Sequence, residues 1–164
     1  MMQKIDNCMF VTRSASNPRR RPMSTIPKRD EGSIFILTEA TSSAARDVGA
    51  DGTVLLAYQG SSDHFCVAGQ ASVIDDTALV KQLWSPGAEA FWPDGPEASN
   101  VVTIKVAPDR ADYWDEPNPI VASAKFLFSL ISQQPPDMGE RGGRQSVDAR
   151  MGSVPSGSVP WLTG

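Results

Sequence analysis

The sequence has few of the residues that metal and disulfide sites use. Its 164 residues include one histidine, His64, and two cysteines, Cys8 and Cys66. A single histidine excludes zinc motifs that need two, such as H-E-x-x-H. The cysteines lie far apart without C-x-x-C spacing, which excludes a zinc ribbon and a disulfide framework. We expect two reduced, largely buried thiols and no metal site.

Long apolar runs and the common glycine motifs are also absent. The longest apolar segments, Ile34–Leu37 and Val54–Ala57, are far shorter than the roughly 20 residues of a membrane-spanning helix. Asp6 and Asn7 interrupt the N-terminus, where a signal peptide would be continuously apolar. The phosphate-binding motifs G-x-x-x-x-G-K-[ST] and G-x-G-x-x-G do not occur, nor does the G-x-S-x-G of hydrolases. We expect a cytoplasmic protein that has no membrane partner.

Charge is distributed unevenly along the chain. Residues 1–29 hold seven basic side chains and one acidic one, net +6, whereas residues 30–164 have a net charge of −10. The overall charge of −4 disfavours nucleic acid as a partner. A small basic patch in an acidic protein, centred on Arg19–Arg21, suits a small anion, and a solvated turn is the alternative.

Hydrophobic patterns predict a chain of short strands with few helices. We expect helices from a cap in Thr41–Ser43 to Val48, from Asp75 or Asp76 to Trp84, and over Val121–Ile131. Ser85–Asn100, which has three prolines, is predicted as a loop. The predicted strands are Cys8–Arg13, Arg20–Ile26, Ser33–Thr38, Val54–Tyr58, His64–Ile74 and Val101–Ala107.

These elements favour a mainly β, α+β domain built on an antiparallel barrel. The domain is expected over residues 1–132, followed by a Pro/Gly/Ser-rich tail over residues 133–164. The strands around Ile34–Leu37 and Val54–Tyr58 are apolar on both faces, but a small barrel buries only its inside. Helices can cover one outer face and a second copy of the chain the other, so we expect a homodimer.

Several segments, in this order and near this spacing, resemble the pyridoxamine-5'-phosphate-oxidase-like flavoproteins, above all their general stress protein branch. The resemblance covers about residues 5–131 and implies an FMN-binding split β-barrel, a six-stranded antiparallel Greek-key barrel with short flanking helices. The segments are C-M-F-V-T (8–12), R-P-M-S (21–24), I-F-I-L-T-E-A (34–40), V-L-L-A-Y (54–58), F-C-V-A-G-Q-A (65–71), L-W (83–84), F-W-P-D-G (91–95) and A-D-Y-W (111–114).

The resemblance implies two FMN molecules at the subunit interface of a homodimer, with FAD as an alternative, and oxidoreductase activity with a small-molecule donor and acceptor. Matched residues would hold the phosphate, line the ring or reach across from the partner subunit. The implied cofactor-binding residues are Arg21, Met23, Ser24, Leu37, Thr38, Ser42, Ser43, His64, Trp92 and Trp114.

Physical chemistry is consistent with this assignment. A phosphate favours guanidinium groups, hydroxyls and free N–H groups at a helix start, which Arg19–Arg21 and Thr41–Ser43 provide if the two segments meet. The flavin ring favours an apolar slot with a few polar groups, and His64 is a candidate for one. The alternative for His64 is an ordinary hydrogen-bonded strand residue, and for Cys66 an inert buried thiol. No other side chain is an obvious proton donor to substrate, so we expect hydride transfer without dedicated acid–base groups.

The chain departs from the family pattern at two places. Ala44 stands where relatives have a phosphate-binding lysine, and this departure favours a non-catalytic flavin-binding or stress-response module as the alternative function. Trp114 is followed by D-E-P-N-P-I-V, without the R-x-H-x-R segment by which pyridoxamine-phosphate oxidases hold their substrate. Pyridoxal-phosphate synthesis is therefore disfavoured.

Overall fold

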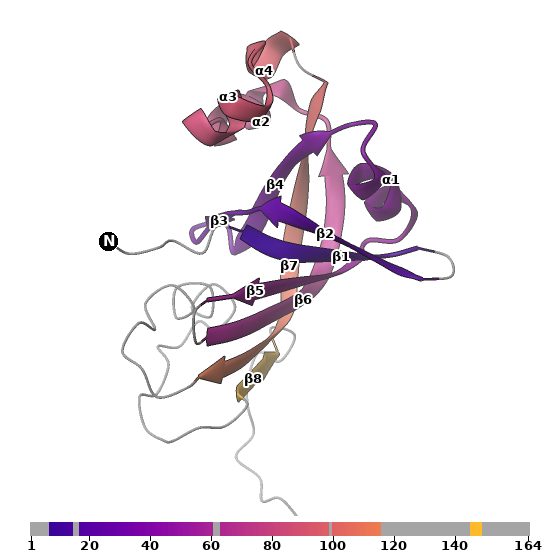
Figure 1. Cartoon of the computed structure of the whole chain (residues 1–164), viewed down its shortest axis with the longest axis vertical. Helices are drawn as coiled ribbons and strands as arrows, with labels where there is room; N and C mark the ends of the chain where they lie inside the picture. The colour runs from indigo at the N-terminus through magenta and orange to yellow at the C-terminus, as the bar shows by residue number, and fades with distance from the viewer. Residues whose placement is uncertain (1–6, 15–16, 61–62, 99, 116–144, 149–164) are drawn as a thin grey trace, which may run out of the picture.

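The computed structural model describes residues 7–14, 17–60, 63–98, 100–115 and 145–148, which form eight strands and four short helices (Figure 1). The strands are β1 (Asn7–Arg13), β2 (Pro18–Ser24), β3 (Ile26–Lys28), β4 (Ser33–Glu39), β5 (Thr53–Gln59), β6 (Asp63–Ile74), β7 (Val101–Asp115) and β8 (Gln145–Asp148). The helices are α1 (Ser43–Ala50), α2 (Thr77–Leu83), α3 (Pro86–Phe91) and α4 (Gly95–Ala98).

The strands form one antiparallel sheet that curls back on itself. Its order is β2-β1-β5-β6-β7-β4-β3, and β8 pairs with β7. The two ends of this order, β2 and β3, are separated in the chain only by Thr25. Thr25 is buried at this corner, and its hydroxyl lies 3.3 Å from the Tyr58 hydroxyl on β5. When β2 and β3 are counted as one bent strand and β8 is left out, the sheet order has six strands, the number predicted for the barrel.

The core lies inside the barrel and follows the alternation of the strands. Every second residue of β1 and β5 is buried, as expected when one face of each strand lines the interior. On β4, Ile34, Phe35 and Ile36 are all buried, which confirms the prediction that this strand is covered on both faces. The fully buried residues of the interior include Phe10, Ile36, Leu56, Val67, Ile104 and Val106.

Helix α1 begins where the sequence predicts but ends two residues later. Ser42 is its N-cap, and its hydroxyl accepts a hydrogen bond from the N–H of Ala45. The predicted end at Val48, before Gly49, is wrong. Gly49 stays helical, and the helix is closed at Asp51, whose N–H donates to the carbonyl of Asp47.

Helices α2, α3 and α4 gather at one end of the barrel (Figure 1). Asp76 caps α2, as predicted. The prediction of a loop over Ser85–Asn100 is wrong, because α3 and α4 lie within it. Pro86 occupies the first turn of α3, where proline is tolerated, and Ser85 caps that helix. None of the helices in the described residues is long and apolar enough to cross a membrane.

Strand β7 is longer than predicted. It continues through Pro108 to Asp115, although this proline and the charged residues of its second half interrupt the apolar alternation. The register with β6 shifts between Ala68 and Gly69, opposite Pro108, so the sheet accommodates the proline at an irregularity. The helix predicted over Val121–Ile131 and the boundary at residue 132 lie outside the described residues.

Candidate functional site

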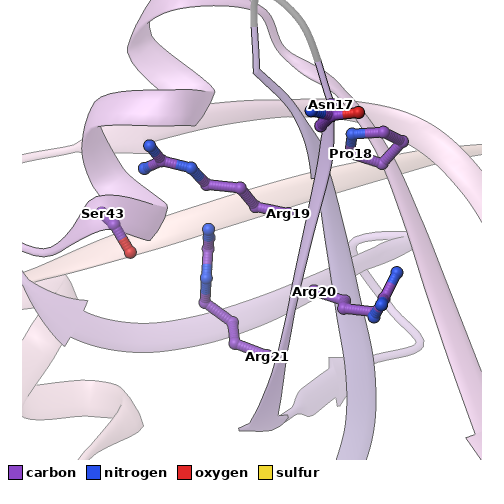
Figure 2. A pocket seen from close by; sticks show the side chains of 6 residues that line it. All are labelled: Asn17, Pro18, Arg19, Arg20, Arg21 and Ser43. Atoms are coloured by element: carbon purple, nitrogen blue, oxygen red, sulfur yellow. The ribbon is translucent and has the colours of Figure 1, made fainter.

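An open pocket of about 570 Å³ lies between β2 and the start of α1. Its lining joins the most basic segment of the chain to the N-terminus of a helix. Figure 2 shows the guanidinium groups of Arg19 and Arg21 extending from β2 toward α1, on the side where Ser43 lies. The lining residues are Asn17, Pro18, Arg19, Arg20, Arg21 and Ser43.

The alternation of β2 determines which arginines face the helix. Side chains two residues apart on a strand share a face, so Arg19 and Arg21 point the same way and Arg20 points away from them (Figure 2). Arg21 is the more enclosed, with 19% of its side chain exposed against 54% for Arg19. The pocket therefore has one enclosed and one exposed guanidinium group.

Asp47 on α1 holds both of these arginines. Its Oδ2 accepts a 2.8 Å hydrogen bond from Nη2 of Arg21 and a second, also 2.8 Å, from the hydroxyl of Thr12 on β1. Nη1 of Arg19 lies 3.6 Å from its Oδ1. Burial alone would raise the pKa of Asp47, but these hydrogen bonds and the charges of both arginines outweigh it and lower the pKa. The carboxyl is thus a firmly ionised anchor.

The start of α1 supplies hydroxyl and N–H groups to the pocket. Ser43 and Asp47 are four residues apart and therefore share one face of the helix. The Ser42 hydroxyl accepts from the N–H of Ala45 and, over 3.0 Å, from the Thr38 hydroxyl. Among the described residues no hydrogen bond uses the N–H groups of Ser43 or Ala44. These are the donors that helix starts offer to anions.

One atom of the pocket lacks the partner that its burial requires. Nη1 of Arg21 is buried and makes no hydrogen bond, although Nη2 of the same group is bound to Asp47. A buried donor without an acceptor costs about 1–3 kcal/mol. An anionic oxygen would satisfy it, so the donor set fits a phosphate group.

Ala44 has a different environment from the pocket. It is 1% exposed and belongs to the barrel core together with Val48, one turn further along α1. Position 44 therefore faces the core, and the positive charge of the pocket comes from β2. Arg46 is exposed and does not line the pocket.

Three predicted site residues lie beside or away from this pocket. Met23 shares the face of Arg21 on β2 and packs against the barrel core. Leu37 is half-buried on β4, next to Thr38, whose hydroxyl bonds Ser42. Ser24 lies on the opposite face of β2, exposed, and its hydroxyl donates to Asn7 over 2.8 Å.

His64 is separated from the pocket within one chain. It is exposed near the start of β6, whereas the segment after α1 bonds β6 at Ala71, whose N–H donates to Gly52. Seven residues of strand at about 3.3 Å each place His64 roughly 20 Å from Ala71 along β6. His64 pairs with Trp114 of β7, whose side chain lies outside the described residues.

Trp92 belongs to the helical end of the barrel. Its ring centroid lies 6.0 Å from that of Trp84 and 6.1 Å from that of Phe91. Phe91 is 75% exposed, the most exposed large apolar side chain among the described residues. Within one chain, then, the structure brings together Arg21, Ser42, Ser43 and Thr38, and leaves Trp92 and His64 elsewhere.

Sequence reasoning missed Asp47 and Thr12. Asp47 is 26 positions from Arg21 and 35 from Thr12, so no local motif links the three. The available signal was one acidic residue four positions after Ser43, on the predicted helix face that meets the basic segment.

The outer face of β1, β5 and β6 carries an apolar patch. Two rows of paired residues cross these strands, and Met9 and Leu55 are 41% and 38% exposed. Arg110 and Asp112 of β7 pair with the ends of the two rows and form an ion pair of 3.1 Å. An apolar centre beside charged residues is typical of protein interfaces. The rows are Met9–Ala57–Cys66 and Val11–Leu55–Ala68.

Comparison with known families agrees with this architecture. The family model described as pyridoxamine 5'-phosphate oxidase like matches residues 1–137, more than half of the chain. The chain belongs to this family. The resemblance read from its ordered motifs is thereby confirmed. No curated protein matches the sequence significantly.

Solved structures of pyridoxamine 5'-phosphate oxidase-like proteins share the split-barrel fold. General stress protein 26 of Bacillus anthracis is 23% identical, with 68% of this chain and 86% of that chain covered and a TM-score of 0.60. General stress protein 26 of Jannaschia sp. CCS1 is 19% identical, with 90% of this chain and 92% of that chain covered and a TM-score of 0.64. The general stress FMN/FAD binding protein of Xanthomonas citri is 20% identical, with 72% of this chain and 85% of that chain covered and a TM-score of 0.63.

Proposed function

We propose that this chain is a flavin-binding protein of the general stress type that holds the phosphate of FMN between β2 and α1. Arg19, Arg21 and Ser43 would hold the phosphate. The observation that carries the proposal is the buried Nη1 of Arg21, which has no acceptor in a pocket built from guanidinium, hydroxyl and N–H groups. A structural relative described as FMN/FAD binding supports the choice of a flavin, with FAD as the alternative.

We propose in addition that two chains associate through the apolar patch on β1, β5 and β6. Met9 and Leu55 are exposed there although their strands lie in the middle of the sheet order. Covering these side chains with a second copy would stabilise both, since burial contributes about 25 cal/mol per Å² of apolar surface. The partner subunit would also be the source of residues that one chain leaves far from its pocket, His64 and Trp92 among them.

The proposed activity is electron transfer between a reduced nicotinamide, or a similar small donor, and a small acceptor. A bound flavin supplies the hydride-accepting ring, and the protein contributes binding, orientation and the exclusion of water. His64, the candidate proton donor in the sequence, lies away from the pocket in one chain. Hydride transfer without an acid–base residue is therefore the simplest form of the proposed activity, and a non-catalytic flavin-binding module is the alternative.

The absorption spectrum of the purified protein tests flavin binding. We expect bands in the visible region and release of FMN on denaturation, or, for a colourless protein, a change in the absorption and fluorescence of added FMN. A colourless protein that leaves the spectrum and fluorescence of added FMN unchanged would refute the proposal.

Turnover separates the two functions. An oxidoreductase with FMN bound consumes NADH or NADPH faster than an equal concentration of free FMN does. A rate equal to that of free FMN with every donor tried would favour the non-catalytic module. Pyridoxamine-phosphate oxidation is disfavoured by the segment after Trp114, and is checked by measuring oxygen consumption with pyridoxamine phosphate as donor.

A further inference from the structure

We propose that Asp47 is a positioning residue for phosphate recognition, which strengthens the binding of an anion although it is itself an anion. The proposal rests on the proposed function, because FMN supplies the phosphate. It assigns to Asp47 the orientation of Arg21 and Arg19, and to Thr12 the orientation of Asp47.

The hydrogen bonds around Asp47 assign a separate role to each of its oxygens. Oδ2 is held by Thr12 from β1 and binds Nη2 of Arg21 from β2, both over 2.8 Å. Oδ1 faces Arg19 at 3.6 Å, too long for a hydrogen bond but close enough for charge attraction. The carboxylate therefore binds one edge of the Arg21 guanidinium group and leaves Nη1 for another acceptor.

Asp47 and the two residues that bond its Oδ2 are largely buried. The side chain of Asp47 is 10% exposed and Thr12 is 1% exposed, so neighbouring atoms enclose both. Arg21 at 19% is nearly as enclosed, and an enclosed guanidinium group without a counter-ion would pay a large desolvation penalty. Asp47 thus allows Arg21 to be in place before any ligand arrives.

Two physical effects predict opposite results when the charge of Asp47 is removed. Coulomb repulsion alone predicts tighter binding of phosphate, because a negative charge beside the site disappears. Loss of positioning predicts weaker binding, because a released arginine must be ordered again by the ligand at an entropic cost. The buried, doubly bonded geometry of Asp47 points to positioning as the larger effect.

The test compares Asp47→Asn with the unchanged protein, using FMN and riboflavin as probes in fluorescence-quenching titrations. Asparagine keeps the shape of the side chain but loses the negative charge that holds Arg21 and Arg19. Riboflavin has the same ring and ribityl chain without the phosphate. Asp51→Asn is the matched control. Asp51 is the C-cap of α1 and lies 3.6 Å from Nε of Arg13, and neither residue lines the pocket.

We expect Asp47→Asn to weaken FMN binding about tenfold, the usual size of one charged hydrogen bond, and to leave riboflavin binding unchanged. Thr12→Val should also weaken FMN binding, and Asp51→Asn should leave FMN binding unchanged. FMN binding that is equal or tighter in Asp47→Asn overturns the proposal. Equal losses for FMN and riboflavin also overturn it, because they indicate a general structural defect.

The titrations also separate this inference from the function on which it rests. If the unchanged protein binds neither FMN nor riboflavin, the proposed function fails and the role of Asp47 fails with it. If the unchanged protein binds FMN and Asp47→Asn binds it equally well, the flavin site stands and only the positioning role is refuted.

Discussion

Nη2 of Arg21 and Oδ2 of Asp47 are joined by a hydrogen bond of 2.8 Å that links strand β2 to helix α1. This bond brings the basic N-terminal segment to the only described helix that packs into the barrel core. It consumes one edge of the guanidinium group and leaves Nη1 buried without an acceptor. The proposed binding of a phosphate group, and hence of a flavin, depends on this arrangement.

Two buried threonines should respond oppositely to the same substitution. Thr12 is 1% exposed and its hydroxyl bonds Asp47, whereas Thr103 is 0% exposed and its hydroxyl has no partner. Thr103→Val should raise the free energy of unfolding by about 1 kcal/mol, and Thr12→Val should lower it by about 1–2 kcal/mol. Urea unfolding of both variants measures this. Two changes of the same sign would contradict the assigned partners.

The stability contributed by Asp47 should depend on pH. Burial alone would raise its pKa, but hydrogen bonds from Arg21 and Thr12, with the charges of Arg19 and Arg21, lower it below the usual 3.8. A lowered folded-state pKa stabilises the protein above 3.8, and the effect is lost as the pH falls toward the folded-state value.

Unfolding by urea at several pH values, for the unchanged protein and Asp47→Asn, measures this contribution. The difference in unfolding free energy should be constant from about pH 7 to 5 and should narrow below about pH 4. A difference that stays the same down to about pH 2.5 would show that the ionisation of Asp47 does not matter.

A single charge in the apolar patch should separate the proposed dimer. Leu55→Glu places a carboxylate among Met9, Ala57 and Ala68, and an unpaired charge buried at an interface costs about 3 kcal/mol or more. Sedimentation velocity should show dimers for the unchanged protein and monomers for Leu55→Glu. Val73→Glu is the control, because Val73 is 37% exposed on the neighbouring strand β6 but lies outside the patch. A monomeric unchanged protein would contradict the proposal.

The reactivity of Cys66, compared with that of the core residue Cys8, reports on the same patch. Burial raises the pKa of Cys8 to about 12, so its reactive thiolate is scarce at neutral pH. Burial and Asp112 also raise the pKa of Cys66, which is half-buried on the patch. Iodoacetamide should modify Cys66 before Cys8, and Cys66 faster in Leu55→Glu than in the unchanged protein. Mass spectrometry of digested samples measures these rates. Equal rates of Cys66 modification in Leu55→Glu and in the unchanged protein would argue against an interface at the patch.

Local sequence patterns were sufficient for strands β1, β4, β5 and β6 and for the start of α1. The alternation in β1 and β5 and the cap at Ser42 are properties of consecutive residues, so one sequence reveals them. The ordered motifs then indicated the family, and with it the barrel. Errors arose where proline was read as a breaker, since Pro86 begins α3 and Pro108 lies within β7 at a shift in register.

The site was only partly predictable, for a reason of distance along the chain. Arg21, Ser42 and Ser43 were found because each belongs to a motif, but their meeting depends on Asp47 and Thr12, which come from two other places in the sequence. The resemblance also grouped His64 and Trp92 with the phosphate residues, although in one chain they lie near other parts of the barrel. The second subunit of the proposed dimer would bring such residues to the pocket, and patterns within one chain do not place it.

The most direct test of the central claim is the affinity of FMN for the unchanged protein and for Arg21→Ala, measured by fluorescence quenching. Arg46→Ala is the matched control, because it removes the same charge from an exposed position of α1 outside the pocket. We predict that Arg21→Ala weakens FMN binding by at least about tenfold, while Arg46→Ala binds FMN like the unchanged protein. Equal affinities for all three proteins would show that the pocket between β2 and α1 does not hold the phosphate.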